Sequence, residues 1–335
     1  MINPISSQQD LRPLIVFGQR SAAMGLLGWF VLLFTTTSDS HETELIHKIV
    51  FYAFLVIVPL ALSLVPAGDR RGNLRLYRLI MLGQPVAAII TIASFFVEKG
   101  LLSAAISVAW FILTALIALF GLTRLVARRF YPLEELSIDA GLSYLPVAGA
   151  WLMVYRLGVQ PFDYGETIIL LTVIHFHFAG FATPIIAGLI GRMLAARQQS
   201  QPSKTFLLIV VALVAAMPLI AAGITFSPWL GLIGTLLLTT GLVLLAVLTL
   251  TRGWRAIAPT SARLLLVLAA LSSCVAMVLA CLYAYSIVTY TLIIRIPTMA
   301  MTHGLLNAFG FVTCSLIAWA IISARHSVYL GEPRG

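Results

Sequence analysis

The sequence predicts an all-α polytopic membrane protein with about ten transmembrane helices, and three observations carry this prediction. The chain has 335 residues, 60% of them hydrophobic and only 10% charged, and its mean hydropathy is +1.02. A soluble domain cannot bury that much apolar surface. Apolar segments of about 20 residues, the length that crosses a bilayer core, recur along the whole chain. Basic residues concentrate in every second connection between these segments, as in multi-pass membrane proteins.

The predicted spans are windows of about 20 apolar residues. They cover residues 21–38, 46–66, 77–96, 101–123, 135–157, 166–192, 205–226, 229–250, 261–286 and 290–322. The first resembles a signal peptide because Arg12 and Arg20 precede an apolar run, but no small-residue cleavage site stands before the next polar loop. We therefore expect a retained first helix.

The basic residues predict the orientation of the chain. With a cytoplasmic N-terminus, the inner segments hold seventeen Lys and Arg residues, and the outer segments keep only Lys48, Lys99, Arg156 and Arg295. One missed helix would remove this asymmetry, so the positive-inside rule predicts ten spans with both termini cytoplasmic. We expect the protein in the cell inner (plasma) membrane.

Short connections predict one transmembrane domain over residues 1–335. Residues 195–204, rich in Gln and Ser, are predicted to form a flexible cytoplasmic loop. Residues 41–48, HETELIHK, are predicted to form a solvated outer loop, with a weak metal or entrance site as the alternative.

The formal charge of +9 does not indicate nucleic acid, because the basic residues form no stripe. Cys274, Cys281 and Cys314 lie inside apolar segments, where a thiol packs as a small hydrophobe, and no zinc or disulfide spacing follows from them. We expect no metal and no cofactor. The expected partners are membrane lipid and a lipophilic small-molecule substrate, and a homo-oligomer stays open.

The fifth predicted helix begins with carboxylates. Glu135 and Asp139 are four residues apart and share a helix face, so one of them is a candidate proton donor. Glu134 is a candidate substrate-binding group. The structural alternative is that these acids favour the positive end of the helix and pair with Arg128 or Arg129.

The sixth predicted helix carries His175 and His177 about 15 Å from Glu166, near the centre of the membrane. Ionisable groups at that depth are functional candidates. The two rings are rotated by about 200°, so a regular helix cannot direct both at one metal ion. We expect one to face a cavity and the other to bond to a neighbouring helix, while Pro184 can kink the helix.

The tenth predicted helix carries His303 and Asn307, four residues apart on one face. Gly304 and Ala308 form a small-residue seam that lets another helix approach, and Pro297 predicts a break. The His–Asn pair is either an oriented acid/base pair or a link between helices.

These polar groups all fall in the middle or inner half of the membrane, which predicts that they meet in one site. The catalytic candidates are Glu135, Asp139, His175, His177, His303 and Asn307. The substrate-binding candidates are Glu134, Tyr144, Trp151, Phe178 and Phe309, and Phe176 and Tyr155 are further aromatic residues that could line a pocket. Aromatic residues in such helices are more often core or lipid contacts.

Three segments resemble the YndJ-like family of bacterial multi-pass membrane proteins: PLEELSIDAGLSYLPVAGAWL at residues 132–152, HFHFAGFATPIIAGL at 175–189 and THGLLNAFGF at 302–311. The resemblance covers residues 20–325 and implies about ten helices, with transport among the suggested activities. Separately, residues 132–135, Pro-Leu-Glu-Glu, are similar to the Pro-x-Glu-Glu element of integral-membrane lycopene cyclases. That likeness implies acids that protonate a polyene.

Two functions follow from these residues. The first is an intramembrane acid/base enzyme, of cyclase, isomerase or epoxide-opening type, acting on a lipophilic molecule; the chain has no Gly-rich phosphate loop. The second is a secondary transporter or proton-coupled permease in which the same groups titrate. A haem or metal protein that uses His303 and one histidine of the sixth helix is a third interpretation.

Overall fold

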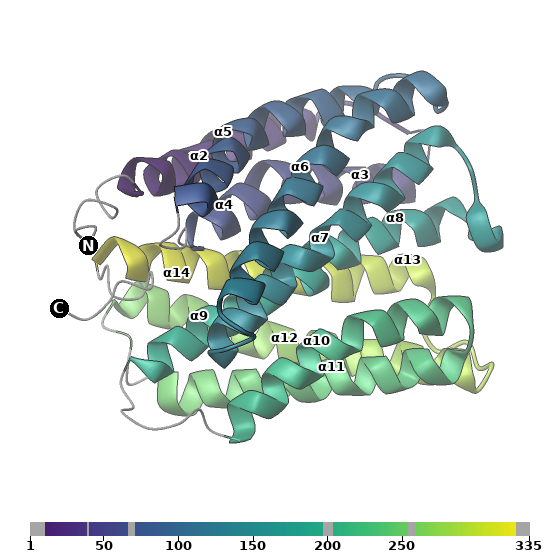
Figure 1. Ribbon diagram of the computed structural model, residues 1–335. Helices are drawn as coiled ribbons and strands as arrows, with labels where there is room; N and C mark the ends of the chain where they lie inside the picture. Colours follow the sequence, from purple (N-terminus) through teal and green to yellow (C-terminus); the bar gives the residue numbers. More distant parts are fainter. Residues whose placement is uncertain are drawn as a thin grey trace. The chain divides into compact units, whose positions relative to one another are not determined.

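The computed structural model describes residues 11–38, 40–65, 71–196, 204–253, 257 and 259–325, and this part of the chain is helical, with short connections (Figure 1). Ten helices among the described residues are long and apolar enough to cross a membrane, by length and composition. The predicted all-α polytopic membrane protein with ten spans is therefore confirmed. The cytoplasmic orientation of the termini stays a prediction.

Several spans contain more than one helical segment because π-helical turns interrupt them. In chain order the segments are α2 (Arg12–Leu32), α3 (His41–Tyr52), η1 (Ala53–Ile57), α4 (Val58–Ser63), α5 (Arg71–Ser94), α6 (Leu101–Ala127), α7 (Leu133–Leu157), η2 (Pro161–Asp163), α8 (Glu166–His175), η3 (Phe176–Ala182), α9 (Thr183–Ala195), α10 (Lys204–Thr225), α11 (Pro228–Leu248), η4 (Thr249–Gly253), α12 (Thr260–Val288), α13 (Ile296–Met299), η6 (Ala300–Gly304), η7 (Leu306–Thr313) and α14 (Cys314–Arg325).

The second span begins earlier than its apolar window, and the predicted solvated loop at residues 41–48 is wrong. Helix α3 starts at His41, where the Ser40 hydroxyl accepts a hydrogen bond from the Thr43 amide and two glutamates occupy the first turn. These are the signals of a capped helix start. His47 and Lys48, expected in water, are only 1% and 6% exposed.

Two other expectations concerned Pro297 and the predicted flexible loop at residues 195–204. Pro297, where a break was expected, lies in the first turn of α13, where a missing N–H costs nothing, and the π-helical segment η6 follows it from Ala300. Of the predicted flexible loop, residues 197–203 lie outside the described residues. The same holds for four arginines used to predict orientation, Arg70, Arg197, Arg255 and Arg334.

The chain divides into two compact units. Unit 1 comprises Met1–Arg129 and Asp139–Ala182, and unit 2 comprises Phe130–Ile138 and Thr183–Gly335. The chain passes between the units three times: before α7, inside α7, and where η3 joins α9. The single transmembrane domain stays a prediction.

In unit 1, α2 packs against η1 and α4, and α5 packs against α6. Close packing is possible because a Cβ at Gly25 would collide with the carbonyl of Leu55. Segment η1 lies next to Pro59, which has no N–H to give to Phe54, the residue five positions before it. The Phe54 carbonyl instead accepts a hydrogen bond from Gln84 Nε2 at 2.6 Å. A side chain from another helix thus satisfies the interrupted backbone.

In unit 2, α10, α11 and α12 lie side by side, and α12 also contacts η7 and α14 (Figure 1). Small residues set the closest approaches. A Cβ at Gly223 would collide with the backbone of Gly231. Glycine at this position therefore allows α10 and α11 to approach closely. A Cβ at Gly188 would lie 2.5 Å from the carbonyl oxygen of Glu134 and closer still to Ile138. Helix α9 therefore packs against the first turns of α7 through glycine.

We expect Gly188→Ala to destabilise the protein by about 1–3 kcal/mol, because the added methyl overpacks the contact between α9 and α7. Gly83→Ala is the matched control: Gly83 is also inside a helix, but a Cβ there meets nothing within 4 Å. The control should keep or raise stability, since alanine is the better helix former. Thermal unfolding of both variants in detergent checks this. Equal melting temperatures would contradict the packing described for Gly188.

Candidate functional site

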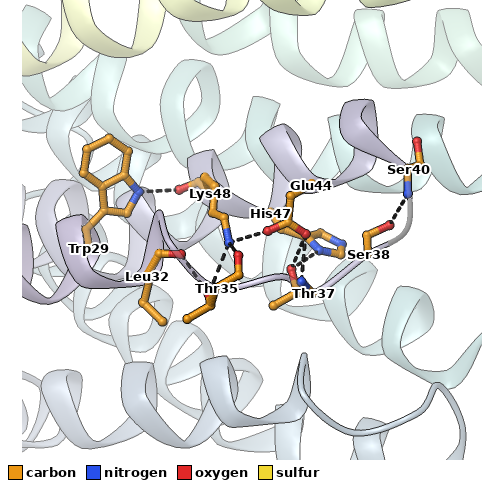
Figure 2. A network of polar contacts seen from close by, with 9 residues as sticks. All are labelled: Trp29, Leu32, Thr35, Thr37, Ser38, Ser40, Glu44, His47 and Lys48. Carbon is orange, nitrogen blue, oxygen red and sulfur yellow. Dashed lines mark hydrogen bonds and ion pairs between the residues drawn. The ribbon is translucent and has the colours of Figure 1, made fainter.

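A connected group of polar side chains joins the first turns of α3 to the α2–α3 connection and to α7. We call it the His47 network, and its members are Thr35, Thr37, Glu44, His47, Lys48 and Tyr155. Figure 2 shows all of these except Tyr155, together with Trp29 of α2. Glu44 and Lys48 are four residues apart in α3 and form an ion pair. Lys48 also donates to the Thr35 carbonyl at 2.6 Å, and Trp29 Nε1 donates to the Lys48 carbonyl at 2.7 Å. The α2–α3 connection is thereby fixed to α3 by hydrogen bonds.

Three hydrogen bonds run through this network in one direction. Glu44 Oε2 accepts from the Thr37 amide at 2.8 Å and from the Thr37 hydroxyl at 2.9 Å. Because that hydroxyl gives its only proton to the carboxylate, its oxygen accepts from His47 Nδ1 at 2.8 Å. His47 Nε2 is then the acceptor for the Tyr155 hydroxyl at 2.7 Å. The result is a chain from Tyr155 through His47 and Thr37 to Glu44.

This chain is buried and connects two helices that lie far apart in the sequence. His47 is 1% exposed and Tyr155 2%. They are 108 residues apart, in α3 and α7. The His47 and Phe95 rings meet edge to face with centroids 4.7 Å apart, and the Tyr155 ring also packs against the imidazole. These aromatic contacts help to hold the His47 ring in place. The hydrogen bond between Tyr155 and His47 thus joins α7 to α3 within unit 1.

Basic residues surround the Tyr155 end of the chain. Lys99 lies 4.3 Å from the Tyr155 ring centroid and 2.6 Å from Glu166 Oε2, and this ion pair is partly exposed. Arg156 is buried and donates to Ser103 Oγ at 2.7 Å, to the Ser94 carbonyl at 2.7 Å and to the Val97 carbonyl. The two carbonyls are at the C-terminus of α5, where a cation is favourable. The His47 network and these basic neighbours of Tyr155 together link α3, α5, α6, α7 and α8 of unit 1.

The predicted carboxylates are bound to arginines. In unit 1, Asp139 accepts from Arg124 Nε at 2.6 Å and lies 3.6 Å from Arg128 Nη1. In unit 2, Glu135 forms a two-pronged pair with Arg192, at 2.6 and 2.8 Å. Such paired carboxylates are strong anionic acceptors rather than ready proton donors. The sequence suggested Arg128 or Arg129 as the partner of these acids: Arg128 does lie near Asp139, but Arg124 and Arg192 were not foreseen.

The two histidines of the sixth span each bond to their own helix. His177 Nδ1 donates to the Val173 carbonyl at 2.8 Å, and its Nε2 accepts from Trp110 Nε1 at 3.1 Å. The His177 ring also lies 5.3 Å from the Phe54 ring of η1. His175 Nδ1 donates to the Leu171 carbonyl at 2.8 Å, and its side chain is half-buried. His177 is therefore the histidine that packs against neighbouring helices.

In unit 2, the structure brings His303 and Asn307 together. His303 Nδ1 bonds to the Ala276 carbonyl at 2.8 Å, so the ring is a neutral donor there. Its Nε2 is 3.1 Å from Asn307 Nδ2, which also donates to the His303 carbonyl at 3.0 Å. Both residues are half-buried. The ring is fixed in orientation by groups from two helices.

The remaining candidates lie in different surroundings. In unit 1, the Tyr144 and Phe176 rings meet edge to face at 6.3 Å, Trp151 lies 5.8 Å from Tyr164, and Phe178 is buried. In unit 2, Glu134 and Phe309 are half-buried. The candidate residues are divided between the two units, so their convergence in one chamber stays a prediction. Over the described ranges, no group of three His, Cys, Asp or Glu residues is arranged to hold a metal ion.

Sequence reasoning missed the His47 network. The local signals were present: Ser40 as an N-cap, acids in the first turn and the Glu44–Lys48 spacing predict a helix start rather than a loop. The contact between His47 and Tyr155 has no local signal.

We expect Asp139→Asn to lower the free energy of unfolding by about 3–5 kcal/mol, because it leaves the buried Arg124 without its charge partner. Glu166→Gln, which breaks the partly exposed pair with Lys99, is the control and should cost about 1 kcal/mol or less. Unfolding by a denaturing detergent measures both. The double variant Arg124→Met with Asp139→Leu should regain most of the lost stability. An Asp139→Asn protein as stable as the unsubstituted protein would refute this role for the pair.

Comparisons with known proteins agree with the membrane architecture. A family model described as YndJ-like protein matches residues 48–311. A membrane protein of Bacillus subtilis (strain 168), YndJ, described as uncharacterized, is 28% identical over 295 residues, which are 86% of this chain and 51% of that protein. The chain therefore spans about half the length of this relative. No solved structure matches. The similarity to lycopene cyclases receives no support from these comparisons.

Proposed function

The chain belongs to the YndJ-like family of membrane proteins, and from its geometry we propose that it is a secondary transporter that couples the passage of a small lipophilic solute to the movement of protons. In this proposal the His47 network is a gate at one end of unit 1. The protein acts in the plasma membrane, and with both termini cytoplasmic the gate lies at the outer face.

The observation that carries the proposal is the directed hydrogen-bond chain from Tyr155 to Glu44. Each donor in this chain faces an acceptor. If every proton moves to the next acceptor, the proton of Tyr155 passes to His47, that of His47 to Thr37, and that of Thr37 to Glu44. A proton received at the Tyr155 end can thus be released at the Glu44 end. Chains of carboxylates and histidines inside the membrane are the usual proton relays of transporters. The partly exposed Lys99–Glu166 pair beside Tyr155 gives the chain access to water.

Protonation of this chain also changes the contact between helices. If His47 Nε2 takes up a proton, it becomes a donor and can no longer accept the hydrogen bond from Tyr155. The Tyr155 hydroxyl must then turn its proton away and accept from His47, so the bond reverses its direction and the contact between α3 and α7 is rearranged. In this proposal, proton uptake at His47 therefore resets the contact that holds the gate.

The interrupted helices support movement. The span that carries His47 contains η1 beside Pro59, and the span that begins at Glu166 contains η3 just before Pro184. π-helical turns are frequent at functional sites, and discontinuous helices are a recurring feature of transporter binding sites. Each interruption lies near the middle of its span, where a helix can bend while its ends stay anchored.

The test is proton movement in vesicles that contain the purified protein. A pH-sensitive dye is enclosed, and an organic cation (ethidium), an organic anion (carboxyfluorescein) and neutral lipophilic solutes are added in turn. We expect at least one solute to move protons only when the protein is present. No solute-dependent proton movement with any of them would overturn the proposal.

Tyr155→Phe identifies the gate within this experiment. It removes one hydroxyl and interrupts the chain at His47, so we expect loss of about tenfold or more in proton-coupled uptake, the scale of losing a positioned proton-transfer group. Tyr77→Phe is the matched control, because Tyr77 is equally buried and donates one hydrogen bond, to the Leu62 carbonyl, outside the network. Equal effects of the two substitutions would show that the Tyr155 hydroxyl is only structural.

The acid/base enzyme is the second candidate, and the His303–Asn307 pair favours it. The pair is half-buried and oriented, as a general base with a positioning amide requires. The pairing of Glu135 and Asp139 with arginines weakens their assignment as proton donors, which ranks the enzyme below the transporter. Incubation of the protein with lipophilic extracts, followed by mass spectrometry, tests it. Conversion that persists in a folded His303→Ala variant would remove this pair from the reaction.

A further inference from the structure

Two arginines in the first half of α2 are exposed and lie on one side of the helix. Arg12 and Arg20 are eight residues apart, which places them about 12 Å apart along the axis, with Val16 between them. Neither makes a hydrogen bond or an ion pair within the described part of the chain. Both belong to a helix that is long and apolar enough to cross a membrane, by length and composition.

The opposite side of α2 packs against protein. Leu14, Gly18 and Ala22 are its buried residues, and a Cβ at Gly18 would collide with Met81 of α5 and crowd Ser63 of α4. At about 100° per residue, the side with Arg12 and Arg20 points roughly 160° away from these contacts. The two arginines therefore face the surrounding lipid.

A groove on this side has both charge and apolar walls. Its described lining residues are Arg12, Pro13, Val16, Phe17 and Arg20. Arg12 and Arg20 are the first and last of these residues in the sequence, and the three apolar residues lie between them in the chain. An arginine exposed to lipid needs a counter-ion, and its planar group binds a phosphate through two hydrogen bonds. The apolar stretch would not retain a free hydrated ion but suits an acyl chain.

We propose that this groove is a binding site for an anionic phospholipid, with the phosphate held by Arg12 and Arg20 and an acyl chain lying along Val16 and Phe17. Arg78 of α5, also exposed, lies one turn before Met81, which contacts α2, and adds positive charge at this end of unit 1. Basic pockets at the cytoplasmic side of membrane proteins bind anionic headgroups in this way. The site is separate from the His47 network, and the proposal does not depend on transport.

The experiment measures phospholipid binding to the purified full chain by native mass spectrometry. Phosphatidylglycerol is titrated against phosphatidylcholine of the same acyl chains. We expect preferential binding of phosphatidylglycerol, and about thirtyfold weaker binding in the Arg12→Gln/Arg20→Gln variant, from about a factor of five for each arginine. The matched control is Arg252→Gln/Arg295→Gln, which removes two exposed arginines of unit 2 and should keep the preference.

Two further arms decide between sources of the phosphate group. Inorganic phosphate in excess should not displace the lipid, and displacement would show a simple anion site instead. Arg20→Lys keeps the charge but removes the planar group, so it should fold as the unsubstituted protein does and lose part of the preference. Unchanged phosphatidylglycerol binding in both arginine variants of α2 would overturn the proposal.

Discussion

A polar group that enters the membrane must find its partner inside the protein, because lipid offers none. This constraint accounts for the main features of the structure. It explains why Gln84 reaches the carbonyl that Pro59 cannot serve, why Arg156 caps the end of α5, and why buried carboxylates and arginines occur in pairs. Within the described part of the chain Arg12 and Arg20 make no such contact, which is why we propose a lipid phosphate as their partner.

The same constraint gives the His47 network its direction. A hydroxyl has one proton and a neutral imidazole has one, so the ionised state of Glu44 determines the donor and the acceptor at every later position. A change of one proton anywhere in the chain must therefore be passed along it or break a hydrogen bond. His47 and Tyr155 are buried, so a broken hydrogen bond between them would be costly.

The fold could be predicted from the sequence because the bilayer fixes both the length and the composition of a span. The errors lie at the ends of spans, where polar residues continue a helix beyond its apolar window. Helix α2 starts at Arg12, since arginine and glutamine are good helix formers, and α3 starts at His41 behind a serine cap. An apolar window cannot detect either residue.

The site could be predicted only in part. Composition and depth single out ionisable residues, so Asp139, His177 and His303 were recognisable as unusual. Their partners were not, because Arg124 and Trp110 come from other helices and no spacing rule relates them. The strongest case is the pair of His47 and Tyr155, which only the folded chain brings within 2.7 Å.

The π-helical turn η1 has a consequence for how the chain can change in length. A π turn holds about one residue more than an α turn, so deletion of one residue within Ala53–Ile57 would let the span close into a regular helix. Every side chain after the deletion would then rotate by about 100° relative to α3, and the residues of α4, all of them buried, would lose their present packing partners. The number of residues between His47 and Pro59 therefore determines the direction in which the side chains of α4 point relative to those of α3. In this segment a deletion is more damaging than a substitution.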